Sequence, residues 1–169
     1  MEWVYAIGQL CCLGASLVFT TIHPVLDHIK DYGHLNLPQV STTWPHVFSV
    51  TLAALALTTG QDINRVFFYV FSPAMFIKAT LMPLTILPDS NPQCKTWHPY
   101  YCLTRNDMLP SGHMIIACCS ALCLPVWGKL VAGATGVLLV ASRMHFSVDV
   151  ILSAWIVVLL EGQQKFYYL

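Results

Sequence analysis

Long apolar runs alternate with short polar connectors along this chain, and each run has the length of a helix rather than of a strand. Pro125 with Lys129 interrupts the last apolar stretch once, and Arg143 with His145 interrupts it again. Hydropathy alone would also permit two longer helices there, but a helix-weakening residue beside a charge favours three. The pattern therefore predicts helices at about 3–22, 44–60, 66–87, 111–127, 129–143 and 146–161.

Composition places these helices in a membrane. Hydrophobic residues make up 56% of the 169 residues and charged residues only 9%, whereas a soluble domain carries about 25% charged residues. We therefore expect residues 1–169 to form one membrane-embedded, all-α domain, a polytopic bundle of six transmembrane helices. The first run follows Glu2 without a lysine or arginine, so it is interpreted as a retained span rather than a secretory signal.

Charge and cysteine usage narrow the partners. Eight basic residues balance eight acidic ones without a basic cluster, which argues against a nucleic-acid partner. Most cysteines lie inside apolar runs, where a buried thiol is the usual interpretation, and their spacing predicts no metal site. Cys94 and Cys102 instead flank the polar connector 89–109 and could form a disulfide if it faces an oxidising lumen. The other long connector, 27–43, is predicted to be a loop or interfacial segment.

Two histidines are predicted to reach the same membrane face. In a six-span arrangement, the connectors after the first, third and fifth helices lie on one side. His113 opens the fourth predicted helix, and His145 lies between the fifth and sixth. Because ionisable residues are costly within a membrane, each is a candidate functional residue.

His145 and Asp149 stand one helical turn apart, so their side chains share a helix face. The carboxylate could accept a proton from one imidazole nitrogen and leave the other nucleophilic. A histidine at a helix end, paired with an acid only for solubility, is the simpler alternative.

Ser111, Gly112 and His113 follow Pro110 at the start of an apolar helix, where free backbone amides favour an anion. Gly112 would allow close approach of a phosphate, Ser111 could donate hydrogen bonds, and His113 could protonate a leaving oxygen. An ordinary turn into a helix is the alternative.

Two basic residues, Lys78 in the third apolar run and Arg143 beside His145, would supply positive charge for a phosphate ester. Each could instead extend toward lipid headgroups.

The segments 106–113 (NDMLPSGH) and 143–150 (RMHFSVDV) resemble the two signature motifs of the sphingomyelin synthase and inositol phosphorylceramide synthase family. That family is a branch of the type 2 phosphatidate phosphatase superfamily. Asp107 falls where the first motif has an aspartate, and Lys78 stands where the family commonly has arginine. Pro110 is more similar to the lipid phosphatases, whereas the spacing of Arg143 to His145 is more similar to the synthases.

The resemblance implies a metal-free and cofactor-free phosphotransfer through a phosphohistidine. His145 would attack a phospholipid headgroup phosphate, and Asp149 would orient the His145 ring. His113 would act first as an acid and then as a base. Lys78, Asp107, Ser111, Gly112 and Arg143 would bind the substrate. The acceptor would be ceramide or a similar lipid alcohol, and the site would face the Golgi lumen or the cell exterior in a eukaryote. A lipid phosphate phosphatase and a non-enzymatic membrane protein remain alternatives, and the headgroup, acceptor and oligomeric state stay open.

Overall fold

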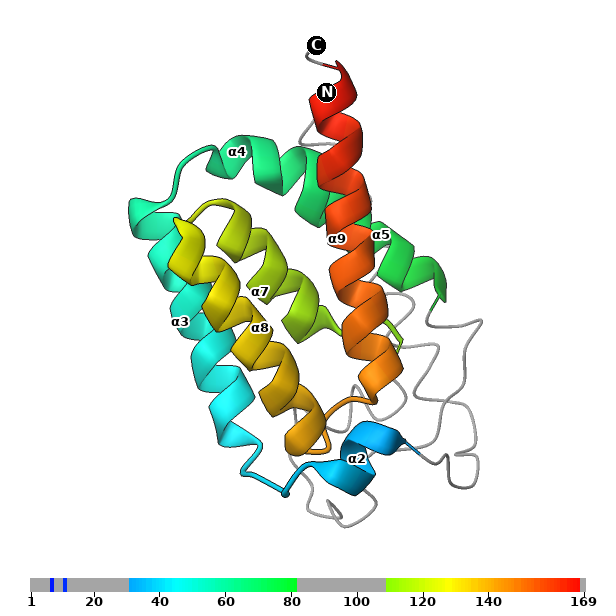
Figure 1. Ribbon diagram of the computed structural model, residues 1–169. Coiled ribbons are helices and arrows are strands. Elements are labelled where there is room, and N and C mark those ends of the chain that lie inside the picture. The colour runs from blue at the N-terminus through cyan, green and yellow to red at the C-terminus, as the bar shows by residue number, and fades with distance from the viewer. Residues whose placement is uncertain (1–6, 8–10, 12–30, 82–108, 168–169) are drawn as a thin grey trace.

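The computed structural model describes residues 7, 11, 31–81 and 109–167, and within these ranges every regular element is a helix (Figure 1). The expected all-α class is therefore confirmed for this part of the chain. The helices and their bounds are α2 (Tyr32–Asn36), α3 (Thr43–Thr59), α4 (Ile63–Val66), η1 (Phe67–Phe71, a π-helix), α5 (Ser72–Leu81), α7 (Gly112–Leu122), α8 (Val126–Ala141) and α9 (Ser147–Tyr167).

These bounds differ from the predicted ones at several ends. The helix expected at 66–87 begins earlier, at Ile63, and runs through α4, η1 and α5. The one expected at 111–127 ends at Leu122, because Pro125 follows closely and disfavours helical backbone in the residue before it. The helix expected at 3–22 and the segment after residue 81 lie outside the described residues.

Only one helix in the described part, α9, is long and apolar enough to cross a membrane, over Ser147–Gln164. α7 and α8 are shorter apolar helices. α7 has 11 residues, which at about 1.5 Å per residue is roughly half the thickness of a bilayer core. The described residues thus form an apolar helical bundle, and the six-span arrangement stays a prediction.

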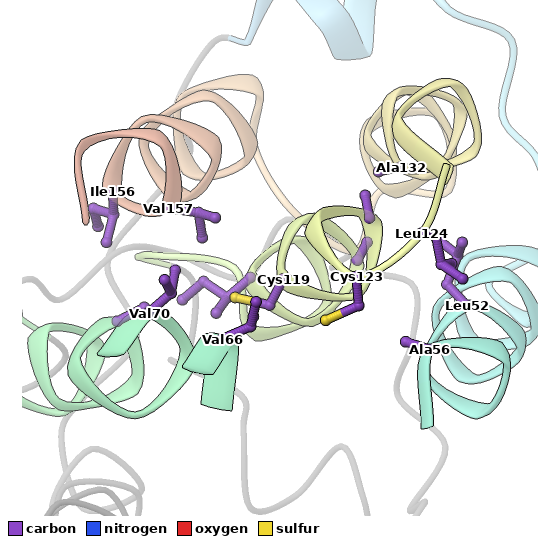
Figure 2. Packing of buried hydrophobic residues seen from close by; sticks show 14 of the residues in the cluster. Leu52, Ala56, Val66, Val70, Cys119, Cys123, Leu124, Ala132, Ile156 and Val157 are labelled. Atoms are coloured by element: carbon purple, nitrogen blue, oxygen red, sulfur yellow. The ribbon is translucent and has the colours of Figure 1, made fainter. Parts of the chain in front are cut away.

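The hydrophobic core surrounds α7, which packs on α3, α5, α8, α9 and η1. Figure 2 shows core side chains pointing toward α7 from the surrounding helices. Leu52 of α3, Val70 of η1 and Val157 of α9 are each no more than 1% exposed. Because α7 contributes to contacts with every other long helix, its position fixes where its first residues, Gly112 and His113, lie.

Some polar side chains are buried within the hydrophobic core, and many large apolar side chains are exposed. Several buried residues are small hydroxyl side chains, and two of them bond back to their own helix: Thr135 to Val131 O at 2.8 Å and Ser153 to Asp149 O at 2.6 Å. The exterior of three helices instead carries large apolar side chains. They are Trp44, Val47, Val50 and Leu57 on α3, Val126, Trp127, Leu130 and Val137 on α8, and Val148, Ile151, Trp155, Val158 and Leu159 on α9.

Small residues on one face of α8 allow it to pack closely against its neighbours. Gly128, Ala132 and Gly136 recur at every fourth position and are buried. A methyl group at Gly136 would lie 3.1 Å from Val150 Cγ1 and 3.3 Å from Met114 Sδ. Gly136 thus lies where α7, α8 and α9 meet, and close approach of this kind is typical of helix interfaces in membrane proteins.

We predict that Gly136→Val destabilises the bundle by about 1–3 kcal/mol through overpacking. Gly133→Val is the matched control, because no described atom lies within 4 Å of the position its Cβ would take. Both variants place the same β-branched side chain in α8, so the difference isolates crowding. Thermal unfolding in detergent measures it, and equal midpoints for the two variants would contradict the tight interface.

Candidate active site

Three helices, α3, α7 and α9, begin at the same end of the bundle. Two of them have a histidine in the first turn, and a histidine lies just before the third. His113 lies in the first turn of α7, His46 in the first turn of α3, and His145 just before α9. The rings of His113 and His145 have centroids 6.2 Å apart. The two histidines singled out from the sequence are therefore brought together by segments far apart in the chain.

Asp149 lies in the first turn of α9, and His145 precedes that helix. The two side chains are neighbours, as their spacing of four residues predicts. Its Oδ2 is 3.6 Å from His145 Nδ1, an ion-pair distance that is longer than a hydrogen bond. The same oxygen accepts a hydrogen bond from the Phe146 amide at 3.0 Å. Asp149 is fully buried, and its Oδ1 has no hydrogen-bond partner among the residues that the structure describes. A small rotation of this carboxylate or of the His145 ring would complete the pair.

Arg143 closes α8 in a conformation that usually belongs to glycine. Its φ is 61°, in the left-handed region. The amide of Met144 donates to Leu139 O at 3.2 Å, and that of Arg143 donates to Val140 O at 3.0 Å. These are the two hydrogen bonds of a Schellman motif. The Arg143 side chain turns back so that Nη2 donates to Leu37 O at 3.1 Å.

Lys78 is buried against the start of α7. It is 2% exposed, and its Nζ donates to Pro110 O at 2.6 Å. A Cβ on Gly112 would lie 3.5 Å from Lys78 Cε, which is ordinary van der Waals contact. Lys78 therefore places its amino group beside the loop that precedes α7. It is one of the substrate-binding residues expected from the sequence.

Ser111 is the N-cap of α7, and its Oγ accepts a hydrogen bond from the Met114 amide at 3.3 Å. It is fully buried, so capping is the role that the structure gives to its oxygen, while the hydroxyl hydrogen remains a donor. Asp107, Cys94 and Cys102, which the sequence also singled out, lie outside the described residues.

Sequence reasoning missed His46. Its Nδ1 lies 2.8 Å from Nε2 of His113, and the two rings meet edge to face with centroids 4.6 Å apart. A signal was present: the segment between the first two predicted helices lies on the same side as His113 and His145. A histidine at the start of the second helix belongs to that side by the same argument.

The sequence predicts a loop or interfacial segment at 27–43, and the structure packs part of it against the site as the short helix α2. Asp31 caps α2 by accepting from the His34 amide at 3.0 Å. It also accepts from the Ser147 amide at 2.7 Å and from Ser147 Oγ at 2.8 Å. One carboxylate thus joins the first turns of α2 and α9.

His34 extends this contact to the residues before α9. Its Nε2 lies 3.0 Å from His145 O, and its ring stacks on Phe146 with centroids 5.3 Å apart. The backbone at His145 is therefore held from the α2 side as well as by the end of α8. Gly33 permits this approach, since a Cβ there would collide with Ser147 Oγ.

Burial raises the pKa of Asp31, but the hydrogen bonds from Ser147 and His34 outweigh it and leave the pKa below its ordinary value of 3.8. A carboxyl group whose pKa is lower in the folded state stabilises the fold above its unfolded pKa. That contribution is lost as the pH falls through the folded pKa.

No group of three histidine, cysteine or acidic side chains within the described ranges is arranged to hold a metal ion. Comparison of the chain with protein-family models, with curated proteins and with solved structures finds no significant match.

We predict that Asp31→Asn destabilises the protein at neutral pH by about 1 kcal/mol, the usual worth of a helix cap. The amide keeps one acceptor oxygen but presents an NH₂ group where the carboxylate accepts. Asp62→Asn is the control, because the Asp62 side chain caps no amide in the described structure. The difference in thermal midpoint between wild type and Asp31→Asn should shrink below about pH 3.8. A constant difference down to pH 2 would contradict the role of the charged carboxylate.

Proposed function

We propose that this protein is a membrane-embedded lipid phosphotransferase that moves a phospholipid headgroup phosphate to ceramide or a similar lipid alcohol. The observation that carries the proposal is the meeting of His113 and His145 at one end of the bundle, with Asp149 at 3.6 Å from His145. The resemblance of 106–113 and 143–150 to the sphingomyelin synthase motifs supports the same chemistry.

The apolar exterior supports a membrane location. Large aliphatic and tryptophan side chains lie on the outer faces of α3, α8 and α9, while several serines and Thr135 are buried. A bundle in lipid needs no hydrophobic core to drive assembly and packs instead through small residues and interhelical or local hydrogen bonds. α9 has the length and composition for one crossing.

Nucleophilic attack is assigned to His145. One imidazole nitrogen, Nδ1, faces Asp149. The proposal assigns to the other, Nε2, the attack on phosphorus that forms a phosphohistidine. The buried carboxylate stabilises the positive charge that develops on the ring, because opposite charges interact strongly where water is excluded.

His113 serves as general acid and then as general base. It protonates the leaving diacylglycerol oxygen and afterwards removes the proton from the incoming hydroxyl, because the second half of the reaction reverses the first. Lys78, Arg143 and the first amides of α7 supply positive charge for the phosphoryl oxygens. The resemblance to the family motifs also implies that Asp107 and Gly112 bind the substrate.

A lipid phosphate phosphatase is the second candidate, and Pro110 before Ser111 favours it, because that proline is more similar to the phosphatases. The two activities share the phosphohistidine and differ in whether water or a lipid hydroxyl takes the phosphoryl group. A membrane protein without catalytic activity is the remaining alternative.

The deciding experiment is an assay of purified protein in liposomes that contain phosphatidylcholine, phosphatidylethanolamine and phosphatidylinositol. Transfer to fluorescent ceramide and hydrolysis of phosphatidate are followed in parallel. We predict a headgroup-bearing ceramide product that is absent with His145→Ala and with His113→Ala, and strongly reduced with Asp149→Asn. Phosphate release without that product would assign a phosphatase, and no turnover of either substrate would favour the non-catalytic alternative.

Arg143 offers a variant that separates catalysis from folding. Glycine adopts the left-handed conformation at φ 61° without strain, so Arg143→Gly should leave the Schellman motif and the folded bundle in place. We predict that its turnover falls by about 10²-fold or more, the loss typical of removing one charge-stabilising donor.

Asp62→Gly is the matched control for this substitution, because Asp62 also has a positive φ, 56°, in the connection between α3 and α4. Its turnover should be unchanged. Equal turnover for Arg143→Gly and wild type would contradict a role of Arg143 in binding the phosphoryl group.

A further inference from the structure

His46 contacts His113 in a way that the proposed mechanism does not use. The Nδ1 atom of His46 and the Nε2 atom of His113 lie 2.8 Å apart. At this separation one nitrogen must carry a hydrogen and donate it while the other accepts, because two facing hydrogens would collide. The contact therefore holds one shared proton.

This shared proton limits the charge of the pair. Two imidazoles have four ring nitrogens, and while the contact persists, one of the two facing nitrogens is bare. The pair then carries at most one positive charge, and its protons leave in steps that belong to the pair rather than to either residue. A group that alternates between one positive charge and none is what general acid and base catalysis requires.

The position of His46 also fixes the ring of His113. His46 is partly buried in the first turn of α3, directly after the buried Pro45, and α3 packs on α7 along its length. The His113 ring has two imidazole neighbours, with centroids 4.6 Å from that of His46 and 6.2 Å from that of His145. The contact at Nε2 restrains rotation of the His113 ring and leaves Nδ1 as the nitrogen that exchanges a proton with the substrate.

We propose that His46 is a positioning residue that orients His113 and shares its proton, so that the two histidines together form the acid and base of the phosphotransfer reaction. This inference rests on the function proposed above. His46 acts through His113, and the reacting lipid contacts the latter.

The proton balance of the reaction closes on this pair. In the first half, a bond forms between His145 and phosphorus, the bond from phosphorus to the leaving oxygen breaks, and one proton passes from the pair to that oxygen. In the second half, the acceptor oxygen bonds phosphorus, the bond to His145 breaks, and the hydroxyl proton returns to the pair. The pair ends with the charge with which it began.

Three variants test the role of His46. His46→Ala removes the contact, and His46→Asn places an amide close to the former Nδ1 position without a group that titrates. Val50→Ala is the control, because Val50 lies one turn further along the same face of α3 and is 68% exposed. Each variant is purified in detergent, and its helical content and melting are compared with those of the wild type.

The first readout is the pH dependence of kcat/KM for phosphotransfer. His46→Ala should lose roughly tenfold to a hundredfold, less than the full contribution of about 10²–10⁴ from a general acid, and its pH profile should shift. His46→Asn should recover part of the rate but keep the altered profile. Val50→Ala should match the wild type. An unchanged rate in His46→Ala, or a loss that is uniform across pH and equal in His46→Asn, would overturn the proposal.

The second readout does not depend on activity. In protein labelled with ¹⁵N-histidine, the His113 ring nitrogens should titrate in two steps in the wild type, as coupled groups do. The first step leaves the hydrogen-bonded pair with one positive charge, and the second, at lower pH, protonates both rings and breaks the contact. His46→Ala should remove one step, and an identical His113 titration in both proteins would overturn the shared proton. If no phosphotransfer is seen in the wild type, the proposed function fails, and the coupled titration still decides whether His46 and His113 form a pair.

Discussion

Burial of the short helix α7 at the centre of the bundle is the constraint on which the rest of the structure depends. Because α7 packs on α3, α5, α8, α9 and η1, none of these can move without changing its position. Its first turn carries His113, and the same packing brings the starts of α3 and α9 beside it. The hydrophobic contacts in the middle of the bundle thus determine the distances between polar side chains at its end.

Polar chemistry gathers at that end for an electrostatic reason. A helix N-terminus carries a partial positive charge and unpaired amide hydrogens, and three described helices, α3, α7 and α9, begin there. The carboxylate of Asp31 satisfies one of these amides by accepting a hydrogen bond from Ser147 N in the first turn of α9. Lys78 and Arg143 add full charges from the end of α5 and the end of α8. The C-terminus of α8 and the carboxylates of Asp31 and Asp149 oppose this positive charge. The proposed function therefore assigns anion binding to the N-terminal amides and to the two cations rather than to the field as a whole.

The sequence predicted the helical class, the breaks near Pro125 and Arg143, and the helix-turn spacing of His145 and Asp149, because each depends on local pattern. It did not predict helix ends closely, since α7 stops at Leu122 for reasons of nearby backbone geometry. It missed α2 and His46 because their importance arises from contacts between distant segments. Asp31 contacts Ser147, and His46 contacts His113, and neither pairing has a periodic signature in the sequence.

Several costs coincide at the junction of α8 and α9, and their coincidence argues for a chemical role. A structural turn would place glycine at Arg143, where arginine has φ 61°, and an apolar side chain at Asp149, whose Oδ1 lacks a hydrogen-bond partner in the described structure. Lys78 adds a buried cation nearby. Each choice opposes stability on local grounds, and such choices collect at functional sites, where the geometry needed for chemistry outweighs them. Among the described residues, Asp62 also has a positive φ, and it lies in an ordinary connection beyond the far end of α3. Strain there is isolated, whereas beside His145 it accompanies Asp149 and Arg143, two residues of the proposed phosphotransfer mechanism.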